Sequence, residues 1–324
     1  MEFRTLGSTG LLVSELCLGT MTFCWTSTEQ ESYEVMDTAF AAGINFFDTA
    51  DVYSRWAPGN PGGVAEEIIG KWLKMRRIPR DQIIIATKVR GRMWEGPDGE
   101  GLSRVHIMRA VEDSLRRLQL DVIDLYQSHH PAENTPQDET LRAFDDLIKQ
   151  GKVRFIGCSN YKAHQLREAL EISKQNHLAR YESLQPHYNL IWRGEFEHEL
   201  QALCAQEHIG VIPYSPLQAG FLTGKYKRGQ PIPPNSRGAS NERIQNWLKD
   251  ERALTLLDTL SQVSQARGET MTVTALAWML TNPVVSSAII GASHVSQLQE
   301  SLAAVGKRLS QEEMQKLNQV SDWS

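Results

Sequence analysis

Four side chains that could do acid–base chemistry stand where apolar runs of the sequence end. Asp48 follows the run INFF, Tyr53 comes five residues later, Lys88 ends QIIIATK, and His129 follows DVIDLYQ within the sequence QSHHP. The pKa of a phenol is about 10, and a neighbouring ammonium lowers it because the positive charge favours the phenolate. If the fold brings them together, an acid, a phenol, an ammonium and an imidazole could carry out general acid–base catalysis.

Each of these residues also has a structural explanation. Asp48 could cap the segment that follows it, Lys88 could be a solvated lysine, and Tyr53 could pack against the Pro/Gly-rich loop after it. His129 and His130 could form a turn or bind a metal, but no third ligand occurs at a telling spacing, and HELQA lacks the second histidine of H-E-x-x-H. We favour function, because four separate structural explanations would all have to fall on one rim of the fold.

Short apolar runs alternate with amphipathic helical patterns along the chain. In one predicted helix, Val105, Met108, Val111, Leu115 and Leu118 recur at helical spacing, and Ser103 before them is a candidate N-cap. Alternating strands and helices predict a parallel sheet. Eight such units predict an α/β fold of the closed (β/α)₈ or TIM-barrel type, with an open doubly wound sheet as the alternative. The predicted strands are residues 14–20, 44–49, 82–88, 121–127, 153–159, 182–188, 210–215 and 284–291.

Turn-rich segments complete this plan. Two short runs around GSTG predict an N-terminal β-hairpin. The Pro/Gly-rich segment 55–63 and the long excursion 216–246 predict loops at the C-terminal face of the barrel, where such enzymes place their active sites. Because the strand–helix rhythm resumes after each loop, we expect residues 1–324 to form a single domain.

Composition excludes several other classes of protein. The chain has 324 residues, a net charge of −5, 41% hydrophobic and 23% charged residues, so a nucleic-acid-binding face is not expected. No apolar run approaches the ~18 residues of a membrane span, and MEFRTLGSTG lacks the apolar core of a secretory signal. The four cysteines are widely scattered, which is typical of reduced thiols in a cytoplasmic protein.

The motifs together resemble the aldo-keto reductase superfamily over nearly the whole chain. They are LCLGTMTF, GINFFDTADVY, ATKV, IDLYQSHHP, GKVRFIGCSN, YNL, IPYSPLQAGFLTGKY and IIGASHVSQLQES. YSPL and GFLTGKY are similar to the bacterial and potassium-channel β-subunit-like branches. The resemblance implies a catalytic tetrad of Asp48, Tyr53, Lys88 and His129. Tyr53 would protonate a carbonyl oxygen while NADPH delivers hydride, Lys88 paired with Asp48 would tune Tyr53, and His129 would orient the carbonyl.

The resemblance also implies a binding site for NADPH, with NADH possible. No G-x-G-x-x-G occurs in the sequence, as expected for barrel reductases, which bind the dinucleotide through strand-end loops. Ser293 and His294 stand where the family often has Arg or Lys for the 2′-phosphate, and Ser301 stands where asparagine is common, so the preference for NADPH is weakened. The residues implied to bind the cofactor are Gly19, Thr20 and Met21; Ser159, Asn160 and Gln185; Tyr214, Ser215, Leu217, Gly220, Leu222 and Lys225; and Gly291, Ser293, Gln297 and Glu300.

Aromatic residues in the predicted loops indicate an apolar substrate pocket. We expect Trp25, Trp56, Trp94 and His130 on the substrate side, and small to medium aldehydes, ketones or quinones as substrates. Neither a resident metal nor a protein partner is implied. Two other functions stay open at this stage, an NADPH-binding regulatory or redox-sensor subunit with little turnover, and a metal-dependent barrel hydrolase using both histidines and Asp48.

Overall fold

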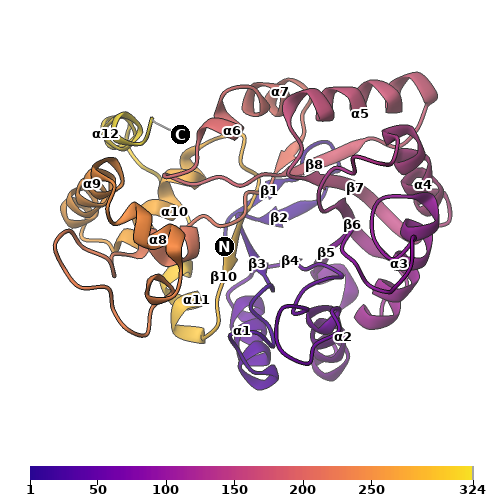
Figure 1. The fold of residues 1–324 in the computed structure, drawn as a ribbon, viewed down its shortest axis with the longest axis horizontal. Coiled ribbons are helices and arrows are strands. Elements are labelled where there is room, and N and C mark those ends of the chain that lie inside the picture. The colour runs from indigo at the N-terminus through magenta and orange to yellow at the C-terminus, as the bar shows by residue number, and fades with distance from the viewer. Residues whose placement is uncertain (323–324) are drawn as a thin grey trace.

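The computed structural model describes residues 1–322, and eight parallel strands form its centre. They pair in the order β10-β3-β4-β5-β6-β7-β8-β9, so neighbours in sequence are neighbours in the sheet except where β10 meets β3 (Figure 1). The eight predicted strands are all present. Their bounds are β3 (Leu16–Gly19), β4 (Phe46–Asp48), β5 (Ile84–Val89), β6 (Ile123–Ser128), β7 (Val153–Ser159), β8 (Tyr181–Gln185), β9 (Gly210–Val211) and β10 (Ala288–Gly291).

The sheet closes on itself between β9 and the segment that leads into β10. Val211 forms a parallel bridge with Val285. The amide of Ser286 donates to the Val211 carbonyl at 2.8 Å, and the amide of Ile289 donates to the Pro213 carbonyl at 2.9 Å. These bonds complete a ring of strands, so the prediction of a (β/α)₈ barrel is confirmed and the open doubly wound sheet is not.

The N-terminal hairpin fills one end of the barrel. Strands β1 (Phe3–Thr5) and β2 (Leu12–Ser14) pair antiparallel, as predicted. Leu6, Leu11 and Val13 are buried in the same apolar cluster as inward-facing strand residues such as Phe46 and Leu125. Gly7 has φ +52°, and a Cβ there would lie 2.6 Å from the Glu182 carbonyl oxygen, so only glycine fits this close approach. The hairpin therefore leaves the C-terminal end of the strands as the mouth of the barrel.

Helices surround the strands and bury a second, larger core against their outer faces (Figure 1). Among the helix starts, Thr28 and Ser310 form capping boxes with the glutamates three residues later. The helices are α1 (Glu29–Ala41), α2 (Val64–Arg76), α3 (Arg104–Leu118), α4 (Gln137–Lys149), α5 (Ala163–Asn176), α6 (Gly194–Glu197), α7 (Leu200–Gln206), α8 (Glu242–Trp247), α9 (Glu251–Arg267), α10 (Met271–Thr281), α11 (Val295–Leu302) and α12 (Gln311–Ser321).

Helix α3 follows its predicted bounds closely but buries a somewhat different face. Ser103 is the N-cap, since its side chain accepts from the His106 amide at 3.2 Å. The buried face runs through Ile107, Val111 and Leu118, whereas Val105 is 60% exposed. Val105 lies about 200° around the helix from Ile107, so its inclusion in the core-facing stripe was wrong.

The two predicted loops lie beyond the strand ends, and the longer one has some regular structure. The excursion after β9 contains two 3-10 turns, η2 (Gln218–Thr223) and η3 (Arg237–Ala239), followed by α8. Within residues 1–322, no helix combines the length and apolar character needed to cross a bilayer.

Candidate active site

The ammonium of Lys88 is the centre of the cluster at the barrel mouth. Its Nζ donates to Asp48 Oδ2 at 2.5 Å, to the Thr49 carbonyl at 2.8 Å and to Tyr53 Oη at 3.0 Å. Lys88 and Asp48 stand on the neighbouring strands β5 and β4, near the ends of both, and parallel pairing brings their side chains together. The structure therefore joins three residues that are 40 positions apart at most in the sequence.

The second oxygen of Asp48 is held by two amides from inside the barrel. Gln127 Nε2 donates to Asp48 Oδ1 at 3.0 Å and Gln185 Nε2 does so at 2.9 Å. Gln127 is a site residue that sequence reasoning missed. The available signal was an amide near the end of the predicted strand 121–127, because a buried amide needs hydrogen-bonding partners.

Burial dominates the electrostatics of Tyr53 and Lys88. Burial raises the pKa of the Tyr53 phenol, and the attraction of Lys88 offsets only part of that rise. The expected net lowering of this pKa by the ammonium is therefore not what the structure gives. Burial alone would lower the pKa of Lys88, but Asp48 and Tyr53 raise it above its usual range. At neutral pH, Tyr53 carries its proton and Lys88 its charge.

His129 lies beside Tyr53 in the same mouth. The two rings are 5.9 Å apart between centroids, and the His130 ring stacks on His129 at 5.3 Å. Burial, reinforced by Lys88, His130 and Arg90, holds the pKa of His129 well below its usual range, so the ring is neutral near pH 7. In the described part of the chain, no group of three or more His, Cys, Asp or Glu side chains is placed to hold a metal ion.

An amide and a phenol from two further strand ends flank this cluster. Asn160 has φ +61°, a left-handed conformation that asparagine tolerates. Its Nδ2 donates to the His129 carbonyl at 2.9 Å, and its Oδ1 accepts from Tyr214 Oη at 2.8 Å. One face of the Tyr214 ring is covered by the His187 ring, which stacks on it at a centroid distance of 5.0 Å and an interplanar angle of 8°. Tyr214 is thus fixed with one face free for a planar ligand.

A cavity of about 830 Å³ runs from Asp48, Tyr53 and His129 to the start of α11. Its lining passes from the acid–base cluster through amides and hydroxyls to the loop after β10. Of the predicted cofactor and substrate residues, those that line it are Gly19, Thr20, Met21, Trp56, His130, Ser159, Asn160, Gln185, Tyr214, Ser215, Leu217, Gly220, Lys225, Gly291, Ser293, Gln297 and Glu300.

The donor set of this cavity fits a dinucleotide. Amides of Asn160 and Gln185 stand near the catalytic end, where a carboxamide needs both donors and acceptors. Lys225 and Arg237 also line the cavity, and within residues 1–322 neither forms an ion pair with an acid. A Cβ at Gly291 would meet nothing within 4 Å, so the backbone there borders open space. Cations without an acidic partner and bare backbone suit phosphate groups.

Arg237 is the second residue that sequence reasoning missed. It comes from the turn η3 in the long excursion, and its guanidinium lies over the ring of Trp25 at 5.5 Å. That excursion carries several basic residues, and nothing in the sequence singles out this one.

Three predicted residues lie apart from the cavity. Trp94 stacks on His106 at 4.7 Å and lies under the guanidinium of Arg109, which ties its loop to α3. Leu222 is fully buried in the apolar core. Trp25 does not line the cavity either, but its ring meets Trp56, which does, in an edge-to-face contact at 5.6 Å.

The departure from the family pattern at Ser293 and His294 lies at the far end of the cavity. Ser293 is not the N-cap of α11, which begins after His294. Its hydroxyl instead lies 2.6 Å from that of Thr26, which also lines the cavity. His294 Nδ1 lies 3.1 Å from a Glu31 carboxylate oxygen, so the imidazole that replaces an Arg or Lys faces an acid from α1.

These features define a (β/α)₈-barrel enzyme with an acid–base cluster at its mouth and a long polar cavity beside it. The model of the Aldo/keto reductase family matches residues 15–322. The chain therefore belongs to the aldo/keto reductase family, and it is an NAD(P)H-dependent oxidoreductase.

Several relatives match along nearly their whole length. "Uncharacterized oxidoreductase YrpG" of Bacillus subtilis (strain 168) is 36% identical over 324 residues, covering 99% of this chain and 96% of the relative. "Probable voltage-gated potassium channel subunit beta" of Arabidopsis thaliana is 36% identical over 310 residues, covering 94% and 91%. "Putative voltage-gated potassium channel subunit beta" of Schizosaccharomyces pombe is 35% identical over 337 residues, covering 100% and 94%.

Proposed function

We propose that the protein reduces aldehydes, ketones or quinones to the corresponding hydroxyl compounds, with NADPH as hydride donor and Tyr53 as proton donor. The observation that carries this proposal is the buried contact of 3.0 Å between Lys88 Nζ and Tyr53 Oη. It joins a protonated phenol to a fixed positive charge at the end of a cavity that fits a dinucleotide.

In the proposed reaction, the chain binds the carbonyl oxygen and supplies its proton. When bound, the reduced nicotinamide supplies the hydride to the carbonyl carbon. Tyr53 gives its Oη proton to the oxygen, and the resulting phenolate is stabilised by the Lys88 ammonium. Asp48 holds that ammonium in place. Neutral His129 orients the carbonyl, because a neutral imidazole can donate one hydrogen bond without adding a charge.

Cofactor binding would use the residues that line the cavity. Ser159, Asn160 and Gln185 would hold the carboxamide, and the exposed face of Tyr214 would stack on the nicotinamide ring. Lys225 and Arg237 would bind phosphate. We propose NADPH as the preferred cofactor, because these two cations have no acidic partner among the described residues.

The substrate would enter beside Trp56 and His130, which line the mouth next to Tyr53. Trp56 meets both Tyr53 and Trp25 edge to face, at 5.8 Å and 5.6 Å. This aromatic corner would favour apolar or planar carbonyl compounds over highly charged ones.

The test is NADPH oxidation with a panel of aldehydes, ketones and quinones, with Tyr53→Phe beside the wild type. Loss of a positioned general acid costs about 10²- to 10⁴-fold in rate. We expect turnover in the wild type, a loss of that size in the variant, and unchanged NADPH affinity in both. A variant with near-normal turnover would show that Tyr53 is not the proton donor.

A second candidate is a cofactor-binding regulatory subunit with little turnover. It is favoured by the relatives whose names describe potassium-channel β subunits. Tight NADPH binding without measurable turnover across the same panel would support this function instead.

A further inference from the structure

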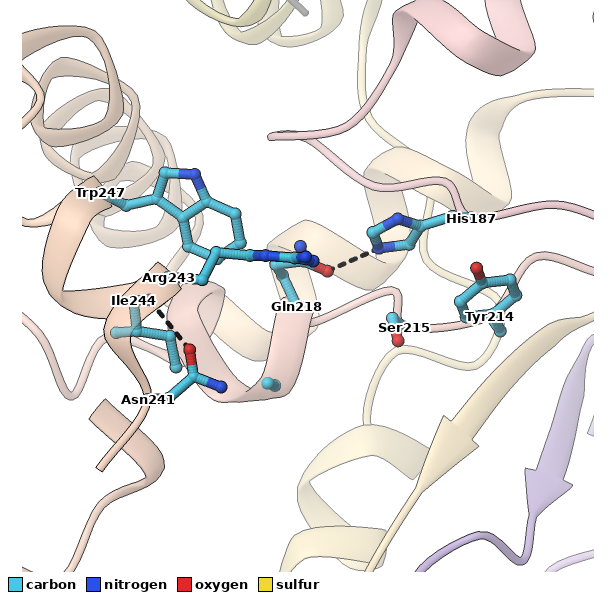
Figure 2. A pocket seen from close by; sticks show the side chains of 9 residues that line it. His187, Tyr214, Ser215, Gln218, Asn241, Arg243, Ile244 and Trp247 are labelled. Atoms are coloured by element: carbon cyan, nitrogen blue, oxygen red, sulfur yellow. Dashed lines mark hydrogen bonds between the residues drawn. The ribbon is translucent and has the colours of Figure 1, made fainter. Parts of the chain in front are cut away.

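A second, smaller cavity lies behind Tyr214, on the side away from the acid–base cluster. It has a volume of about 240 Å³ and is formed between the segment after β9 and helix α8. We call it the α8 pocket, and Figure 2 shows the side chains that line it. Nothing in the proposed reaction uses it.

The polar groups of the α8 pocket are arranged to donate hydrogen bonds. Gln218 is 5% exposed, and its Oε1 already accepts from His187 Nε2 at 2.8 Å and from Asn189 Nδ2 at 3.0 Å. Its Nε2 has no partner among the described residues. Asn241 Oδ1 accepts from the Ile244 amide at 3.1 Å. Of the groups left over, the two amide nitrogens can only donate, and the Ser215 hydroxyl can donate or accept.

One positive charge in this pocket has no acidic partner among the described residues. Arg243 lines the pocket and extends from α8 toward the side formed by Gln218 and His187 (Figure 2). In the part of the chain that the structure describes, its guanidinium forms no ion pair and no hydrogen bond. The acid Glu195 lies near enough to influence His187 and Tyr214 but is not paired with Arg243. A guanidinium beside amide donors is a preferred receptor for a carboxylate.

Flat rings and an apolar side chain form the rest of the pocket. Trp247 and the buried Ile244 come from α8, and the His187 ring stands opposite, stacked between Tyr214 and Trp192. The pocket has a volume of about 240 Å³, which is room for a small molecule with one ring. Benzoate, with one ring and one carboxylate, is a ligand of this kind.

We propose that the α8 pocket is a second binding site, which takes a small aromatic carboxylate with its charge on Arg243 and Gln218 and its ring against Trp247. The site needs no turnover, so it is independent of the proposed reductase activity. Tyr214, Ser215, Gln218 and Ala219 line both cavities, so an occupant would contact the wall that the α8 pocket shares with the main cavity.

The backbone of that wall is itself unusual. Ser215, Gln218 and Ala219 have φ values of +56°, +44° and +52°, which are strained for residues other than glycine. Strain of this kind persists where surrounding contacts over-determine the conformation, and it clusters at ligand clamps. A carboxylate bound to Gln218 would add such a contact.

The test is calorimetric titration of the full chain with benzoate, with neutral benzamide as the ligand control. We expect benzoate to bind with millimolar or tighter affinity and benzamide to bind at least tenfold more weakly. Arg243→Gln should weaken benzoate at least tenfold. Arg77→Gln, which makes the same charge change at the end of α2, away from both cavities, should not.

Two further variants locate the site. Asn241→Asp keeps the cap of α8, because aspartate caps as well as asparagine, but places a negative charge in the pocket and should also weaken benzoate. Tyr53→Phe should leave benzoate binding unchanged. Absence of benzoate binding, or binding that is lost in Tyr53→Phe and kept in Arg243→Gln, would overturn the proposal.

Discussion

Removal of the Lys88 charge should destabilise the protein, because it leaves the buried Asp48 carboxylate without its ion-pair partner. Asp48 is 1% exposed, and among the described residues the only donor to its Oδ2 is Lys88 Nζ at 2.5 Å. At that separation the gross attraction is roughly 7 kcal/mol for an effective dielectric constant of about 20. Desolvation offsets part of it, and removal of one partner of a buried pair costs about 3–5 kcal/mol. We therefore expect Lys88→Met to lower the free energy of unfolding by that amount.

The assay is urea unfolding of a set of matched variants, followed by circular dichroism. Lys71→Met removes an ion pair to Glu29 in which both side chains are about half exposed, and it should cost only ~0–1 kcal/mol. The double variant Asp48→Asn/Lys88→Met should recover at least about half of the loss, because the stranded charge is gone, but no activity. A double variant as unstable as Lys88→Met would refute the reasoning, since the loss would then come from packing and not from charge.

Three other predictions concern the cofactor and the acid. Tyr214→Ala should weaken NADPH about tenfold or more in a calorimetric titration, since stacking on an aromatic ring is worth ~1–3 kcal/mol; equal affinity would remove the stacking role. Arg237→Gln should weaken NADPH by a similar factor, because a charged hydrogen bond contributes ~1.5–3 kcal/mol, and unchanged binding would place the phosphates elsewhere. Because burial raises the pKa of Tyr53 and lowers that of His129, kcat/KM for reduction should stay flat from about pH 6.5 to about 10 and fall above that as the phenol ionises. A fall centred near neutral pH would contradict this assignment.

Much of the architecture was predictable because the strands and helices of a barrel each produce a regular pattern of apolar residues in the sequence. Strands of the ring are buried on both faces and appear as short apolar runs, and polar residues that follow such runs must lie at the mouth. This is why Asp48, Lys88 and His129 could be placed together without any distances. Their roles in catalysis remain predictions.

The rest depended on contacts that have no local signature. Gln127 lies within a strand and acts inward, and Arg237 reaches the cavity only because a long loop folds back over it. We predicted Trp94 on the substrate side for the same reason as Trp56, but its contacts with His106 and Arg109 of α3 hold it away from the cavity. The pKa of Tyr53 also could not be predicted from neighbouring charges alone, because burial outweighs them.

The way the barrel closes determines where the structure opens locally. Strands β6 and β7 pair at five positions and β8 and β9 at two, while the backbone pairing beyond β9 consists of a single bridge and a few amide bonds. Local opening begins where the fewest bonds must break, so the amide of Ser286 should exchange its hydrogen with solvent well before those of β6. The segment after β9 and the segment after β10 both line the main cavity. A ligand that contacts both segments would hold the barrel closed at this point. Its binding would therefore slow hydrogen exchange at the Ser286 amide, which does not line the cavity.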